Sequence, residues 1–157
     1  GSFGLIVLFI IMFIGGCAGS TTGGIKIFRI QLLFGAGSMQ IKKLIQPHGV
    51  FITTFNKKTI KDDAFTSVMG FFFLYIILFS LSAILLGSMG IDFLTSISGA
   101  ASAISNVGPG LGEIIGPSGT YEPLPNAAKW VLSLTMIIGR LEIFTFLVLF
   151  SKYFWRT

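Results

Sequence analysis

The sequence predicts an all-α membrane protein. Hydrophobic residues make up 53% of the 157-residue chain and charged residues only 11%, whereas a soluble domain carries about 25% charged residues. The mean hydropathy is +0.88. The chain also contains 20 glycines, which indicates membrane segments that are interrupted rather than uniform. This composition excludes intrinsic disorder and a collagen-like structure.

The first apolar segment, residues 3–14, is too short to cross a bilayer by itself. As a helix it spans about 18 Å, compared with about 30 Å of hydrocarbon. Five glycines in residues 15–24 interrupt it, and an apolar helical pattern resumes over residues 25–34. We therefore expect residues 1–35 to be the remainder of one transmembrane helix, broken by a glycine-rich loop, and residues 36–64 to form a polar cytoplasmic linker.

The positions of the charged residues predict which side of the membrane each segment faces. Seven of the 11 basic residues lie in residues 26–63, where two aspartates leave a charge of about +5. Such an excess of Lys and Arg in a short loop marks the cytoplasmic side, and Lys152 with Arg156 places the C-terminus there too. Residues 88–129 are net negative and are expected on the outer side. No nucleic-acid partner is expected, because no aromatic residues are interleaved with the basic residues and topology explains the charge.

Two later segments are long enough to cross the membrane. Residues 65–87 contain no charged side chain, and residues 129–150 are flanked by aromatic and basic anchors. Between them, residues 93–105 are apolar and rich in hydroxyls, but as a helix they span only about 20 Å. Because both ends of this region face the cytoplasm, the number of crossings is even. The middle segment must therefore enter and leave the membrane on the outer side as a re-entrant loop.

The residues after that short helix predict a cation site. Pro109 and three glycines in residues 106–112 prevent the helix from continuing, and its inward C-terminal end carries about half a negative charge from the helix dipole. Backbone carbonyls from Ser105 to Gly108 could then replace the hydration shell of an alkali ion. An alternative stays open at this point, in which the short helix and the turn only pack within a membrane bundle. The carboxylates that would concentrate cations at the outer mouth are Asp92, Glu113 and Glu122.

Three motifs make the chain resemble the TrkH-type potassium uptake proteins. They are GGCAGSTTGGIK at residues 15–26, NVGPGLG at residues 106–112 and GRLEIFT at residues 139–145. The related KtrB and plant HKT transporters share an architecture of four helix, pore-loop, helix repeats around one ion path. The resemblance covers nearly the whole chain and implies the last part of this potassium-channel-like architecture, with residues 1–35 in the inner helix of repeat 3 and residues 65–157 forming repeat 4. The parts of repeat 4 implied by the resemblance are a helix (65–87), a pore helix (93–105), a filter (106–110), an outer connection (111–128), a second helix (129–150) and a cytoplasmic end (151–157).

The same resemblance implies roles for individual residues. Gly108 matches the filter glycine of repeat 4, with Ser105, Asn106 and Val107 before it, and K⁺ would bind the backbone carbonyls of residues 106–108. Arg140 matches an arginine that faces the ion path below the filter; an ionisable group at that depth in a membrane helix usually faces a cavity or a partner. The residues that match the gating loop under the filter are Gly15, Gly16, Gly19, Ser20, Thr21, Thr22, Gly23 and Gly24.

The resemblance also implies the function and the partners. We expect channel-like potassium uptake, passive or ion-coupled, by a multi-pass protein of the bacterial inner membrane that needs repeats 1–3 of the transporter to surround an ion. It implies a homodimer and a cytosolic nucleotide-binding regulatory subunit of the TrkA type, for which the basic residues from Lys42 to Lys61 offer a docking surface. No cofactor is expected besides the transported K⁺, and no catalytic constellation favours an enzyme. The alternatives are a non-conducting membrane scaffold with a vestigial pore loop and a polytopic membrane enzyme.

Overall fold

The described part of the chain is helical, with one short hairpin. The computed structural model describes residues 2–17, 23–46, 49, 54–55, 58–59 and 62–141. The strands β1 and β2 pair antiparallel, with Thr54 opposite Thr59. The elements are α1 (Ser2–Phe13), α2 (Ile27–Ile45), β1 (Thr54–Phe55), β2 (Lys58–Thr59), α3 (Asp62–Ser88), α4 (Phe93–Ser105) and α5 (Asn126–Arg140).

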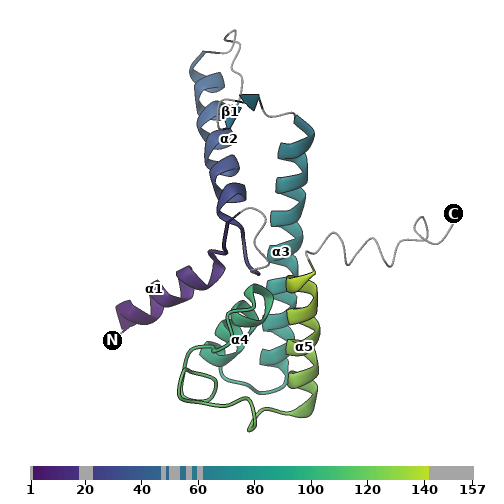
Figure 1. Ribbon diagram of the computed structural model, residues 1–157. Helices are drawn as coiled ribbons and strands as arrows, with labels where there is room; N and C mark the ends of the chain where they lie inside the picture. The colour runs from purple at the N-terminus through teal and green to yellow at the C-terminus, as the bar shows by residue number, and fades with distance from the viewer. Residues whose placement is uncertain are drawn as a thin grey trace, which may run out of the picture.

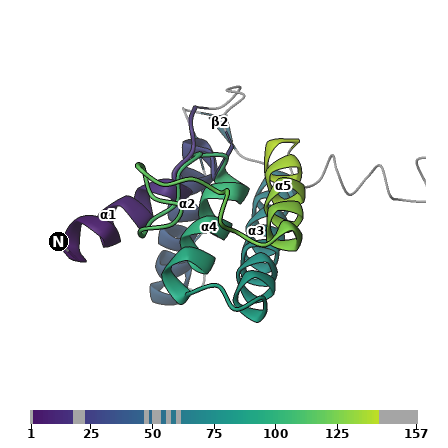
Figure 2. The ribbon, with the colours of Figure 1, turned by 90° about the horizontal axis from the view of Figure 1, so that it is seen from below.

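Helix α3 is the axis around which the other helices are arranged. The first half of α3 lies beside α2, and its second half lies beside α4 and α5 (Figure 1). Viewed along the other axis, α4 lies between α1 on one side and α3 with α5 on the other (Figure 2). The short helix α4 is therefore packed between α1, α3 and α5.

Helix α3 has the length and composition of a membrane-spanning helix. Its residues Phe65–Ser88 form a 24-residue stretch of mean hydropathy 2.5, the one such helix within the described ranges. Many of its large apolar side chains are exposed, as expected for a surface that faces lipid or other transmembrane segments. The predicted crossing over residues 65–87 agrees with this helix, although α3 begins earlier, at Asp62.

Helix α5 is described only in its first part. It begins at Asn126, directly after Pro125, whereas the sequence predicted a start at residue 129. Proline is well suited to the start of a helix because its missing amide hydrogen needs no partner there. Residues 142–157 lie outside the described ranges, so the remainder of the crossing over residues 129–150 stays a prediction, as does the cytoplasmic end.

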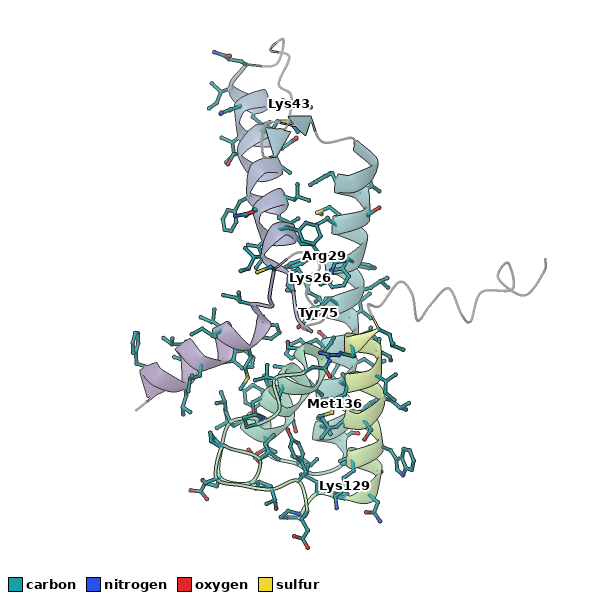
Figure 3. All side chains as sticks on the ribbon, in the orientation of Figure 1. Lys26, Arg29, Lys43, Tyr75, Lys129 and Met136 are labelled. Carbon is teal, nitrogen blue, oxygen red and sulfur yellow. The ribbon has the colours of Figure 1, made fainter. Side chains whose placement is uncertain are left out.

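Helix α2 extends into the predicted linker over residues 36–64, because it continues to Ile45. The sequence predicted the linker from the polar stretch that begins after residue 34, and its cytoplasmic location stays a prediction. Leu32 and Ala36, one helical turn apart, are buried, and the helix packs along α3. Arg29 on α2 places its guanidinium 3.8 Å from the ring centroid of Phe71 on α3, a cation–π contact that holds the two helices together (Figure 3).

Helix α4 has the bounds that the sequence predicted, residues 93–105, and it forms the centre of the core. Its residues from Ser98 to Ser105 are all buried. Leu86 of α3, Ile115 of the following connection and Leu132 of α5 pack around it. Every buried side-chain nitrogen and oxygen in the described residues has a hydrogen-bond partner. Small residues and paired hydroxyls thus allow a polar-containing helix to occupy the interior.

Candidate ion-binding site

The turn that follows α4 ends the helix in the interior of the structure. Asn106 adopts a left-handed conformation, with φ 55° and ψ 42°, which asparagine tolerates better than most residues. Its backbone amide donates to the carbonyl of Ala103 at 3.2 Å, and the backbone amide of Val107 donates to the carbonyl of Ser102 at 3.0 Å. Gly108 then takes a φ of +112°, a conformation that strongly favours glycine.

This turn lies near the middle of α3. The hydroxyl of Tyr75, about halfway along the membrane-spanning stretch of α3, is 2.7 Å from the hydroxyl of Ser105 at the end of α4. On the other side, the side-chain amide of Asn106 donates to the backbone carbonyl of Met136 on α5 at 3.1 Å. Figure 3 shows Tyr75 and Met136 beside the end of α4. Neighbouring helices on both sides therefore fix the turn at mid-depth, with the negative end of the α4 dipole directed at it.

The backbone carbonyls of the turn are not equivalent. The carbonyl oxygen of Gly108 accepts hydrogen bonds from the hydroxyls of Tyr121 at 2.6 Å and Ser102 at 2.9 Å. Within the described residues, no hydrogen-bond donor reaches the carbonyl oxygens of Asn106 or Val107. The assignment of the filter residues stays a prediction, but in this geometry the uncommitted oxygens are those of residues 106 and 107 rather than that of Gly108.

The glycine-rich segment begins and ends against the same part of the structure. Ile14 and Ile25 form an isolated parallel bridge, with Gly15 donating to Ile25 at 2.9 Å and Ile25 donating to Phe13 at 2.9 Å. Gly23 lies so close to the end of α4 that an added Cβ would be 2.5 Å from the carbonyl oxygen of Ser105. The returning end of the predicted gating loop therefore packs directly on the residue that precedes the turn. The predicted gating residues Gly19, Ser20, Thr21 and Thr22 lie outside the described residues.

Arg140 is exposed and is the last residue of α5. The residue before it, Gly139, packs against the end of α4, where an added Cβ would lie 2.0 Å from the carbonyl oxygen of Ile104. Arg140 thus leaves α5 at the level of the turn after α4. Its predicted place below the filter stays a prediction.

The start of α4 and the connection after it carry the negative charge that the sequence predicted for this region. The carboxylate of Asp92 caps α4 by accepting from the amide of Thr95 at 3.0 Å. Hydrogen bonds from the hydroxyl and the amide of Thr95 lower the pKa of Asp92 below its ordinary value, which keeps it ionised. Glu113 and Glu122 lie exposed on the connection between α4 and α5. In the described ranges, no three His, Cys, Asp or Glu side chains gather into a set that could hold a metal ion.

The sequence did not single out the hydroxyl groups that hold the turn. Ser98 and Ser102 are one helical turn apart on α4, and Ser98 accepts from the amide of Leu111 at 2.9 Å. That four-residue spacing of hydroxyls was a signal that could have been used. Nothing local to Tyr121 predicts its contact with Gly108, because thirteen residues separate them. Burial raises the pKa of Tyr121, and the neighbouring hydroxyl of Ser102 offsets this only in part.

A short buried helix that ends at mid-depth in a turn with free carbonyls, next to a membrane-spanning helix, defines a pore-loop membrane protein. The family description "TrkH: Cation transport protein" matches residues 2–156. The chain therefore belongs to the TrkH family of cation transport proteins, which confirms the resemblance read from the three motifs.

Individual relatives show the same relationship. The chain is 46% identical to the Trk system potassium uptake protein TrkI of Halomonas elongata over 156 residues, which are 99% of this chain and 32% of that protein. It is 38% identical to the Trk system potassium uptake protein TrkH of Escherichia coli K12, covering 96% of this chain and 31% of that protein. The crystal structure of the potassium transporter TrkH from Vibrio parahaemolyticus matches with a TM-score of 0.86 and 37% identity, covering 98% of this chain and 32% of that one. The predicted fold class is thereby confirmed, and the chain spans about a third of the length of these relatives.

Proposed function

We propose that this chain is the C-terminal part of a transporter that takes up potassium ions through a four-repeat pore. The observation that carries the proposal is the turn after α4, where uncommitted backbone carbonyls follow the negative end of a buried helix at mid-depth. Carbonyl oxygens in such an arrangement can replace the water around a potassium ion. The names of the relatives, which are potassium uptake proteins, support the same substrate. No covalent step is involved, and the transported ion is the only small molecule required.

The test is rubidium uptake by the complete transporter in cells that lack their own potassium uptake. Gly108→Ser should abolish most uptake, because a φ of +112° is strained for any residue with a side chain even though nothing lies within 4 Å of its Cβ position. Gly87→Ala is the matched control, since Gly87 is helical and its Cβ position is equally open. If the complete transporter reaches the membrane but carries no rubidium, the scaffold alternative replaces this proposal.

We further propose that residues 15–24 act as the gate below the filter. The contact of Gly23 with the carbonyl of Ser105 supports this role, because it brings the returning end of the loop against the site. The test deletes residues 18–22, which removes the middle of the segment. The expected result is a higher rate of rubidium uptake that no longer responds to voltage. An unchanged rate and an unchanged voltage response would contradict a gating role.

We propose that the lysine-bearing end of α2 faces the cytosol of a bacterium and binds a nucleotide-binding regulatory subunit, and that complete subunits form a homodimer in the inner membrane. Lys42 and Lys43 are exposed in the last turn of α2. Lys43 and Lys129 lie at opposite ends of the structure (Figure 3). Reversing the charge at both residues of α2 should reduce copurification of the regulatory subunit, whereas Lys129→Glu should not. Equal copurification with all variants would exclude this surface.

A further inference from the structure

Two hydroxyl groups use the whole hydrogen-bonding capacity of the Gly108 carbonyl. A carbonyl oxygen has two lone pairs, and the hydroxyls of Tyr121 and Ser102 donate to this oxygen at 2.6 Å and 2.9 Å. The carbonyls of Asn106 and Val107 receive no such bond from the described residues. The carbonyl oxygens of Asn106 and Val107 are therefore available to a cation, whereas the carbonyl oxygen of Gly108 is already hydrogen-bonded to the protein.

The space beside the Cα atom of Gly108 is open. No heavy atom lies within 4 Å of the position that a Cβ atom would occupy there. Its φ of +112° is a conformation that glycine adopts without strain. The following residue, Pro109, cannot donate a hydrogen bond from its backbone nitrogen. The direction of the Gly108 carbonyl therefore depends on the groups that donate to it.

Both donors are fixed firmly by the rest of the protein. Ser102 is fully buried in α4. Tyr121 packs against the core cluster that includes Leu86, Ile115 and Leu132, and its raised pKa keeps the hydroxyl protonated at neutral pH. The hydroxyls thus have defined positions from which they can direct a flexible peptide group.

We propose, resting on the function proposed above, that Tyr121 and Ser102 are positioning residues that keep the Gly108 carbonyl out of the ion path and thereby set the preference for potassium over sodium. The ion is bound by the carbonyls that precede Gly108. If the Gly108 peptide were released, its oxygen could rotate toward the ion and add a ligand. The number and orientation of carbonyl dipoles around an ion govern the discrimination between these two cations.

The experiment measures sodium inhibition of rubidium uptake by the complete transporter. Tyr121→Phe removes the hydroxyl but retains the ring, and we expect the sodium concentration that halves rubidium uptake to fall about fivefold, as loss of one ordinary hydrogen bond would produce. Ser102→Ala should change selectivity in the same direction. Ser133→Ala is the control, because Ser133 donates to the carbonyl of Lys129 on the exposed side of α5 and its loss should leave selectivity unchanged.

A second measurement separates this proposal from the function on which it rests. The thermal midpoint of the purified transporter in potassium, compared with that in sodium, reports ion preference without transport, and the difference should shrink in Tyr121→Phe. Wild-type selectivity in both variants, or a uniform loss of rubidium and sodium uptake, would overturn the positioning role. Absence of rubidium uptake in the unmodified transporter would instead contradict the proposed function.

Discussion

Replacing Gly139 by alanine should displace α5 from the end of α4. An added Cβ at this position would lie 2.0 Å from the carbonyl oxygen of Ile104, 2.8 Å from its carbonyl carbon and 3.1 Å from its Cα. All three atoms belong to the backbone of α4, so no side chain can rotate away to make room. Since Cβ contacts under 3.0 Å are essentially never found, the two helices must separate by about 1 Å at this point.

The expected cost follows from two opposing terms. Overpacking of a well-packed interior costs about 1–3 kcal/mol, whereas alanine in place of glycine within a helix gains about 0.5–1 kcal/mol. The net destabilisation is therefore up to about 2.5 kcal/mol, with a central value of about 1 kcal/mol. Ile104 lies two residues before Asn106, so the same displacement should also disturb the bond from Asn106 to Met136 and reduce ion uptake.

The assay is thermal unfolding of the purified complete transporter, followed by intrinsic fluorescence, together with rubidium uptake in cells. Gly37→Ala is the matched control, because Gly37 lies within α2 and nothing approaches its Cβ position within 4 Å. Gly139→Ala should lower the unfolding midpoint by several degrees and reduce uptake, while Gly37→Ala should leave both unchanged or slightly raise the midpoint. Equal midpoints and equal uptake for the two variants would refute the close-contact argument.

Three other predictions concern the same region. The hydroxyls of Ser82 and Thr135 lie 2.9 Å apart between α3 and α5, so Ser82→Ala should lower the free energy of unfolding by about 1 kcal/mol. A double-mutant cycle with Thr135→Val, followed by thermal unfolding, should show that the two effects are coupled. Additive effects would contradict a hydrogen bond between the two side chains. The lowered pKa of Asp92 means that its carboxylate stabilises the fold above its ordinary pKa of about 4 and that this contribution disappears as the pH falls through the lowered value. Asp92→Asn should therefore make the unfolding midpoint less dependent on pH below about 4, and an unaltered profile would assign the acid sensitivity to other groups. Arg140→Ala should raise cation flux through the complete transporter by removing a fixed positive charge, and unchanged flux in a well-expressed variant would remove Arg140 from the mechanism.

The helix that positions the site was predictable because its boundaries are encoded locally. Asp92 provides a capping carboxylate at one end of α4, and Asn106 followed by Pro109 ends the helix at the other. Each signal lies within a few residues of the boundary it sets. The membrane-spanning stretch of α3 was predictable for a similar reason, since a long run without charge has few alternatives to a membrane helix.

Features that depend on contacts between distant segments were not predictable in this way. The continuation of α2 past Ala36 rests on its burial against α3, which outweighs the glycines beside it. The bond from Tyr121 to Gly108 joins the outer connection to the turn and has no local pattern. Gly139 appears in the sequence as one small residue among many, and only its contact with Ile104 distinguishes it.

The bridge between Ile14 and Ile25 joins two backbone segments that run in the same direction. A parallel pair cannot be closed by a tight turn, because the chain has to travel back along the pair before it can join it again. The connection between the two isoleucines therefore has a minimum length, and an insertion should disturb their pairing less than a deletion does. This makes the connection a better place for an inserted reporter group than for a truncation.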